Sequence, residues 1–182
     1  MKNTKFCIAF FAFILQANLS FSQLNLPTPK AVYNKTFIAE LGGAGVLFSA
    51  NFDSRFDANE RLGFGYRLGL GFTTVDESTN GFNYKTVSVP TIPFGVNYLF
   101  GKPNSANIFE VGAGATILTK KKSILNYNDY NEGHFLGHFE FQYRRQPIDG
   151  GFAWRIGFTP IINPDGDILP FAGIGIGYCF SK

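Results

Sequence analysis

Large apolar side chains recur at every second position along most of the chain after residue 35. The last such segment reads Ala-Gly-Ile-Gly-Ile-Gly-Tyr-Cys-Phe at residues 172–180. Successive side chains of a strand point to opposite faces, so one face here is apolar and aromatic and the other is nearly empty. A soluble sheet buries its large apolar side chains, whereas a barrel in lipid turns them outward. The pattern predicts the second arrangement.

The alternation divides into eight segments separated by turn signals. They are Thr36–Gly42, Val46–Phe56, Arg61–Val75, Thr86–Phe100, Asn107–Lys120, His134–Gln146, Gly151–Asn163 and Ile168–Phe180. Most reach the roughly 9–11 residues that a tilted strand needs to cross a bilayer. Short turns alternate with longer polar loops, notably 76–85 and 121–133. We therefore expect an all-β fold, an eight-stranded antiparallel up-and-down transmembrane barrel with both termini at one end.

Two places in this division are weakly defined. The first two segments are separated only by Gly43, Ala44 and Gly45. Pro90 and Pro160 fall on the outward parity, although proline is awkward in a paired strand. Val87 and Val89 have the opposite parity to the residues that follow them, which predicts a bulge or a shift in register near Pro90.

Aromatic residues gather where the predicted strands meet the end that holds the termini. Such girdles suit the headgroup region of a membrane, because an aromatic ring with a polar tip is stable there. The candidate girdle residues are Tyr66, Tyr98, Phe100, Phe109, Tyr143, Trp154, Tyr178 and Phe180.

Charged residues fall on the opposite, inward parity. An eight-stranded barrel has room inside only for side chains, and a buried charge is costly without a partner. We therefore expect paired arginines and carboxylates to fill the lumen as a structural polar core. The candidates are Glu40, Asp53, Arg55, Arg67, Glu110, His138, Glu140, Arg144 and Arg155.

The N-terminus predicts export. Lys2 and Lys5 precede an apolar run of ten residues, and Ser20 and Ser22 are small residues suited to a cleavage site before Gln23. Residues 1–22 are thus expected to be a signal peptide, 23–35 a polar lead-in and 36–182 the barrel. Removing the two lysines leaves 14 basic and 13 acidic residues, from 16 and 13, which gives no reason to expect nucleic acid as a partner. Cys179 then stands alone in the mature chain, as a buried thiol.

The signal peptide, the eight segments and the last strand together resemble the small outer-membrane β-barrel proteins of the OmpA/OmpX-like kind. The blocks at 95–102, 109–115 and 143–152 look like those of uncharacterised members. The resemblance implies residence in the outer membrane of a Gram-negative bacterium, insertion by the barrel assembly machinery and no cofactor. Membrane lipids and lipopolysaccharide are the implied partners, with envelope proteins reached through the external loops. Such proteins end in an aromatic residue, whereas Ser181 and Lys182 follow Phe180 here.

Signals for catalysis or metal binding are weak. His134 and His138 would lie about 13 Å apart on a strand, at about 3.3 Å per residue, too far to share one metal. A lipid-modifying acyl hydrolase or transferase would need His134 beside Ser123 or Ser78. We expect no enzymatic activity and a structural or surface-interaction role. The alternatives are that lipid-modifying enzyme and a soluble lipocalin-like barrel, whose interior would be apolar and whose exterior would be charged.

Overall fold

The computed structural model describes residues 31–78, 84–122 and 133–181. The predicted signal peptide and most of the lead-in lie outside the described residues. So do 79–83 and 123–132, within the two longest loops predicted from the sequence.

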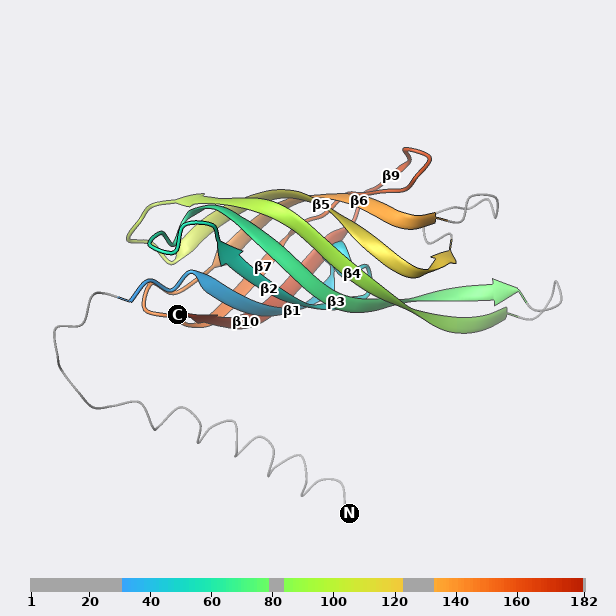
Figure 1. Ribbon diagram of the computed structural model, residues 1–182, viewed down its shortest axis with the longest axis horizontal. Coiled ribbons are helices and arrows are strands. Elements are labelled where there is room, and N and C mark those ends of the chain that lie inside the picture. Colours follow the sequence, from blue (N-terminus) through green and yellow to red (C-terminus); the bar gives the residue numbers. More distant parts are fainter. Residues whose placement is uncertain (1–30, 79–83, 123–132, 182) are drawn as a thin grey trace, which may run out of the picture. The chain divides into compact units, whose positions relative to one another are not determined.

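The described residues form one closed antiparallel barrel (Figure 1). Its strands are β1 (Lys35–Gly42), β2 (Phe48–Arg55), β3 (Gly63–Ser78), β4 (Tyr84–Gly101), β5 (Asn107–Lys122), β6 (Gly133–Arg145), β7 (Gly151–Phe158), β8 (Ile161–Ile162), β9 (Ile168–Leu169) and β10 (Ala172–Phe180). Neighbours run in the order β5-β4-β3-β2-β1-β10-β7-β6, and pairing of β5 with β6 closes the ring. The predicted fold class is confirmed.

The ten strands correspond to eight full strands of the barrel, because β8 extends β7 and β9 extends β10. β8 continues β7 in one register, because Phe141 pairs with Phe158 and His138 pairs with Ile161. The β8–β9 pairing likewise keeps the register of β7 and β10. Lys35, at the start of β1, pairs with Phe180, at the end of β10. Both ends of the barrel chain therefore lie at one rim, as predicted. We call this rim the terminal end and the opposite rim the distal end.

Pro160 explains why β7 and β8 are separate strands. Pro160 has no N–H to donate, so the ladder between β7 and β8 is carried by its neighbours. The Thr159 amide donates to Phe171 O at 2.7 Å, and Pro160 O accepts from the Phe139 amide at 3.1 Å. Pro160 lies between the inward-facing Thr159 and Ile161 in an unbroken register, so it keeps the predicted outward parity, although neighbouring residues bury it.

The predicted shift in register at Pro90 is wrong. Pro90 pairs with Phe72, and the flanking pairs, Thr91 with Gly71 and Val89 with Thr73, keep the same register. Val89 simply faces inward and is fully buried. The irregularity in this part of the sheet lies between Ile117 and Lys122, where β5 pairs with β6.

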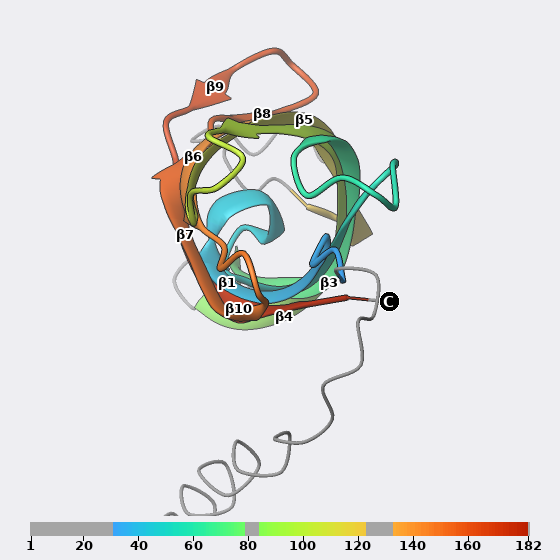
Figure 2. The same cartoon turned by 90° about the vertical axis from the view of Figure 1, so that its left-hand side faces the viewer.

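The connection between β1 and β2 turns into the lumen. Its single 3-10 turn η1 (Gly43–Gly45) is buried, and Figure 2 shows it as the light-blue coil inside the ring of strands. The hydroxyl of Thr116 donates to Ala44 O at 2.6 Å, and that of Thr91 donates to Gly45 O at 3.2 Å. Val46 follows at φ 73°, a left-handed conformation that is uncommon for a β-branched residue. The predicted turn is present, and it also fills the distal lumen.

The lumen therefore has two layers. Aliphatic side chains pack beside η1 in the distal half, a group we call the apolar layer: Val46, Val89, Leu118, Leu136 and Ile161. Arginines and carboxylates occupy the part nearer the terminal end. The sequence had predicted polar residues throughout the lumen.

Candidate functional site

Side chains on the two faces of the barrel wall differ sharply in exposure. On the outer face, Leu70 is 69% exposed and Phe64 is 66% exposed. On the inner face, Arg67 is 4% exposed and Arg155 is 0% exposed. The nine residues predicted for the lumen are all at most 5% exposed, and they are Glu40, Asp53, Arg55, Arg67, Glu110, His138, Glu140, Arg144 and Arg155.

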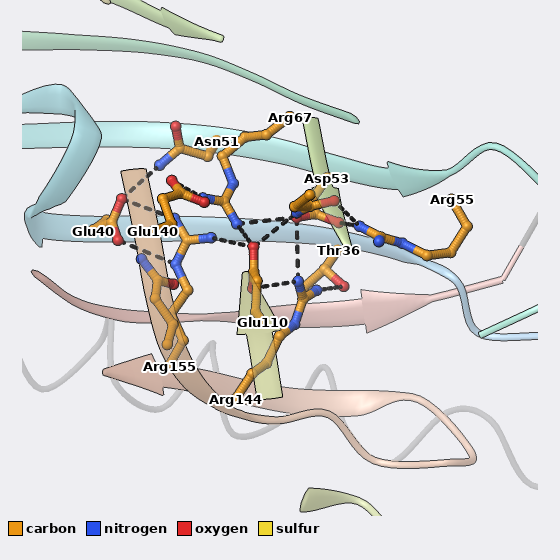
Figure 3. A network of polar contacts seen from close by, with 12 residues as sticks. Thr36, Glu40, Asn51, Asp53, Arg55, Arg67, Glu110, Glu140, Arg144 and Arg155 are labelled. Carbon is orange, nitrogen blue, oxygen red and sulfur yellow. Dashed lines mark hydrogen bonds and ion pairs between the residues drawn. The ribbon is translucent and has the colours of Figure 1, made fainter. Parts of the chain in front are cut away.

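Arg67 lies at the centre of the charged layer (Figure 3). One guanidinium nitrogen donates to Glu140, and the other donates to Glu110 and, at 3.2 Å, to Asp53 Oδ2. The three acids come from β6, β5 and β2, whereas Arg67 comes from β3. Hydrogen bonds between ionised partners are stronger than those between neutral groups. One side chain therefore links four strands across the lumen.

Arg144, on β6, contacts two of the same carboxylates, those of Asp53 and Glu110. Its Nη1 lies 3.2 Å from Asp53 Oδ2 and 3.3 Å from Glu110 Oε2, and its Nη2 donates to Thr36 Oγ1 at 2.6 Å. The Asn97 amide donates to Asp53 and Glu110, each at 2.7 Å. Each of these buried carboxylates thus has several donors, which offsets the cost of removing it from water.

The two ends of the network each hold one further pair. Towards η1, Arg155 donates two hydrogen bonds to Glu40, from Nε to Oε1 at 3.1 Å and from Nη2 to Oε2 at 2.8 Å. Towards the terminal end, Arg55 donates to Asp53, and its Nη1 donates to Gly63 O at 2.9 Å. Four arginines and four carboxylates leave a formal charge of zero, +4 − 4.

His138 joins the charged layer to the apolar layer. Its Nε2 lies 4.0 Å from Glu140 Oε1, and its Nδ1 lies 3.4 Å from the hydroxyl of Thr116. That hydroxyl also holds the carbonyl of Ala44 in η1. The turn inside the lumen is thus connected to the charged layer through two side chains.

A second set of polar contacts gathers the turns at the terminal end. Arg61 donates to Gln146 O at 3.1 Å, Pro103 O at 3.1 Å and Ser105 O at 2.6 Å. Partial burial lowers the pKa of Arg61, although a guanidinium stays charged at any physiological pH. The side chain of Arg61 thereby connects three turns at this rim. Cys179 is also fully buried there, and its thiol donates to Tyr33 O at 3.3 Å.

Aromatic rings follow one another around the outer wall near the terminal end. Centroids of successive rings lie 4.7–6.4 Å apart, within the range of favourable ring packing. One run joins Phe64, Tyr98, Phe100, Phe109, Tyr143 and Trp154, and another joins Tyr66, Phe52 and Phe180. Tyr178 is 57% exposed and pairs with Phe152. The eight candidate girdle residues therefore all lie on the outer wall.

The structure adds little on catalysis. Ser123 lies outside the described residues, and Ser78 is the last residue of β3. His134 Nδ1 lies 3.0 Å from Leu118 O, at the distal end of β6. Residues 31–78, 84–122 and 133–181 contain no group of three or more His, Cys, Asp or Glu side chains arranged to hold a metal ion.

Two members of the polar contacts, Thr36 and Arg61, were absent from the predicted site. Thr36 has inward parity, so the same alternation that selected the charged residues could have selected it. Arg61 lies in a turn, where alternation gives no direction for a side chain. Its three carbonyl partners come from segments more than 40 positions away.

No protein-family model and no curated protein matches the chain. Among solved structures, it is similar to the Yersinia pestis outer membrane protein Ail, whose backbone structure was obtained in a phospholipid bilayer nanodisc. The TM-score is 0.49 with 13% identity, over 81% of this chain and 99% of that chain. The strand pairing described above defines the fold. No helix within the described residues has the length and hydrophobicity of a membrane span.

Proposed function

We propose that this chain is an integral outer-membrane β-barrel with a structural or surface-interaction role and no catalytic activity. In this account the charged layer, the apolar layer and η1 fill the lumen, and the outer wall contacts lipid. Export would depend on residues 1–22, and insertion on the barrel assembly machinery.

The observation that carries this proposal is the inversion of the two faces. Among the residues that the structure describes, twenty-five large hydrophobic side chains are exposed. Soluble monomers rarely expose contiguous apolar patches of more than a few hundred Å². The same wall buries four arginines and four carboxylates on its inner side. A lipocalin-like barrel would have the opposite arrangement, so lipid is the solvent that suits this surface.

The dimensions of the wall support the same proposal. β3, β4 and β5 have 16, 18 and 16 residues, more than the roughly 9–11 needed for a tilted membrane strand. The belt of rings lies near one rim, where an interfacial girdle is expected. The terminal end would then face the periplasm, because short periplasmic turns are typical of such barrels.

The surface-interaction role draws on the part of β3 and β4 beyond the barrel rim. The pairing of β2 with β3 ends at Phe48 and Phe72, and the pairing of β4 with β5 ends at Thr91 and Leu118. β3 and β4 continue to pair with each other up to Ser78 and Tyr84. This two-stranded ribbon has free backbone edges, to which another strand could add.

Fractionation tests the membrane proposal. Expressed with residues 1–22, the chain should sediment with outer membranes on a sucrose gradient, resist extraction by urea and migrate faster on gels when unheated. Mass spectrometry should find Gln23 as the first residue. A chain that stays soluble without detergent would refute membrane insertion.

Loop deletion tests the interaction role separately. Variants lacking residues 76–86 or 123–132 should keep the heat-dependent gel shift, because the strand pairs that close the barrel lie outside both deletions. Loss of crosslinked envelope or surface partners in one of them would support the role. Unchanged partners in both would discard it.

A further inference from the structure

A groove of about 470 Å³ crosses the outer wall of the barrel over β1–β4. Its apolar lining includes Phe37, Ala50, Phe52, Leu68, Leu70 and Ile92. These residues lie on the face that the proposed function turns towards lipid. The groove is separate from the charged layer, which lies on the other side of the same strands.

The groove lies where two small residues face each other across β1 and β2. Ala50 on β2 pairs with Ala39 on β1, whereas the outward pairs on either side are Phe37 with Phe52 and Leu41 with Phe48. The small pair leaves a gap in a wall that is otherwise covered by large side chains. From Phe37 on β1 to Ile92 on β4, the groove crosses three interstrand spacings, about 14 Å at ~4.8 Å each.

A basic residue, Lys35, lies on the side of the groove nearer the terminal end of the barrel. Lys35 precedes Phe37 by two positions on β1, so its side chain leaves the same face of the wall. It pairs with Phe180, whose ring lies 6.3 Å from that of Phe52 in the aromatic belt. Within the described part of the chain, Lys35 makes no ion pair. An ammonium group at this level is suited to a phosphate in the headgroup region.

We propose that this groove binds one acyl chain of a phospholipid, whose phosphate is held by Lys35. This inference rests on the proposed membrane function. An apolar groove of about 470 Å³ that crosses three interstrand spacings is suited to a segment of one acyl chain. The cation lies at the terminal end, which selects a lipid of the leaflet on that side. A second copy of the barrel offers a convex wall, which would not fill a narrow diagonal groove.

Photolabelling tests this site. The mature chain is inserted into phosphatidylethanolamine vesicles that contain a trace of phosphatidylglycerol with a diazirine midway along one acyl chain. After illumination, labelled peptides are mapped by mass spectrometry. We expect labelling around Ala50 and Leu70 to exceed that of the β5–β6 wall around Ala113 and Phe139 severalfold.

Two variants and a matched control sharpen the test. Ala50→Phe fills the groove and should reduce its labelling to the level of the β5–β6 wall. Lys35→Gln removes the cation and should reduce labelling about fivefold. Ala113→Phe makes the same change at an exposed alanine of β5 and should leave labelling of the groove unchanged. The heat-dependent gel shift verifies that each variant is folded.

Each other outcome overturns the inference. Even labelling around the wall that Ala50→Phe does not alter would show that the groove holds no particular lipid. A crosslinked dimer abolished by Ala50→Phe would assign the groove to a second copy. A chain that is nowhere labelled and does not float with the vesicles would refute the proposed function itself.

Discussion

The charged layer and the apolar layer fill the same lumen by different means. Arg67 and Arg144 make directed contacts with carboxylates on other strands, and Asp53 and Glu110 each accept from several donors. Leu118, Leu136 and Ile161 pack without directed bonds. Removing one partner from the first layer leaves a buried charge, whereas removing a methyl group from the second leaves a void. The first layer should therefore be less tolerant of substitution, although both are equally buried.

The largest effect is expected at the centre of the charged layer. Arg67→Met leaves Glu110 and Glu140 without their shortest cationic contacts and should lower the free energy of unfolding by about 3–5 kcal/mol. Equilibrium unfolding in urea from lipid vesicles, followed by the gel shift, measures this change. Arg145→Met is the matched control: Arg145 is exposed on β6, and its loss should cost less than about 0.5 kcal/mol. Equal effects of the two variants would mean that the charged layer is not needed for stability.

Truncating a leucine of the apolar layer should lower the free energy of unfolding by less than Arg67→Met does. Leu118 is 1% exposed, and Leu118→Ala should cost about 2–4 kcal/mol through lost burial and an unfilled cavity. Leu118→Met, which nearly conserves volume, should cost less than about 1.5 kcal/mol. The same unfolding assay checks both. If Leu118→Met lowered the free energy of unfolding as much as Leu118→Ala, the apolar layer would be as intolerant of substitution as the charged layer.

The boundary between the layers is sensitive at Gly43. Its φ is 66°, and an added Cβ would lie 2.6 Å from the carboxyl carbon of Glu40. Gly43→Ala combines backbone strain with displacement of a paired carboxylate and should cost about 1–3 kcal/mol. Gly166→Ala is the control for strain alone, because φ is 90° there and no atom lies within 4 Å of the added Cβ. An equal loss in both variants would show that Glu40 is not disturbed.

The smallest effect is expected from the hydroxyl that holds η1. Thr116→Val removes the donor to Ala44 O and should cost about 1–2 kcal/mol, because the buried carbonyl loses that partner. Thr119→Val, on the same strand at an exposed position, serves as the control. A stable Thr116→Val variant would indicate that packing alone keeps the turn inside the lumen.

The sequence predicted the wall well because alternation is a local property. Inward parity alone placed Arg67 and Glu140 in the lumen, although 73 positions separate them. It did not pair them, because the partner of a long side chain depends on the stagger of all the strands. Val89 was interpreted as a shift in register only because the lumen was assumed to be polar throughout. The inward path of Gly43–Gly45 depends on hydroxyls from β4 and β5, which no local pattern reveals.

The orientation of the wall can be measured with the single tryptophan of the chain. Trp154 is half-buried on the outer face of β7, and its ring lies 5.4 Å from that of Tyr143 in the aromatic belt. In vesicles whose acyl chains carry bromine near the headgroup, its fluorescence should be strongly quenched, while aqueous iodide should have little effect. Strong quenching by iodide with none by the brominated lipid would contradict a wall that faces the membrane.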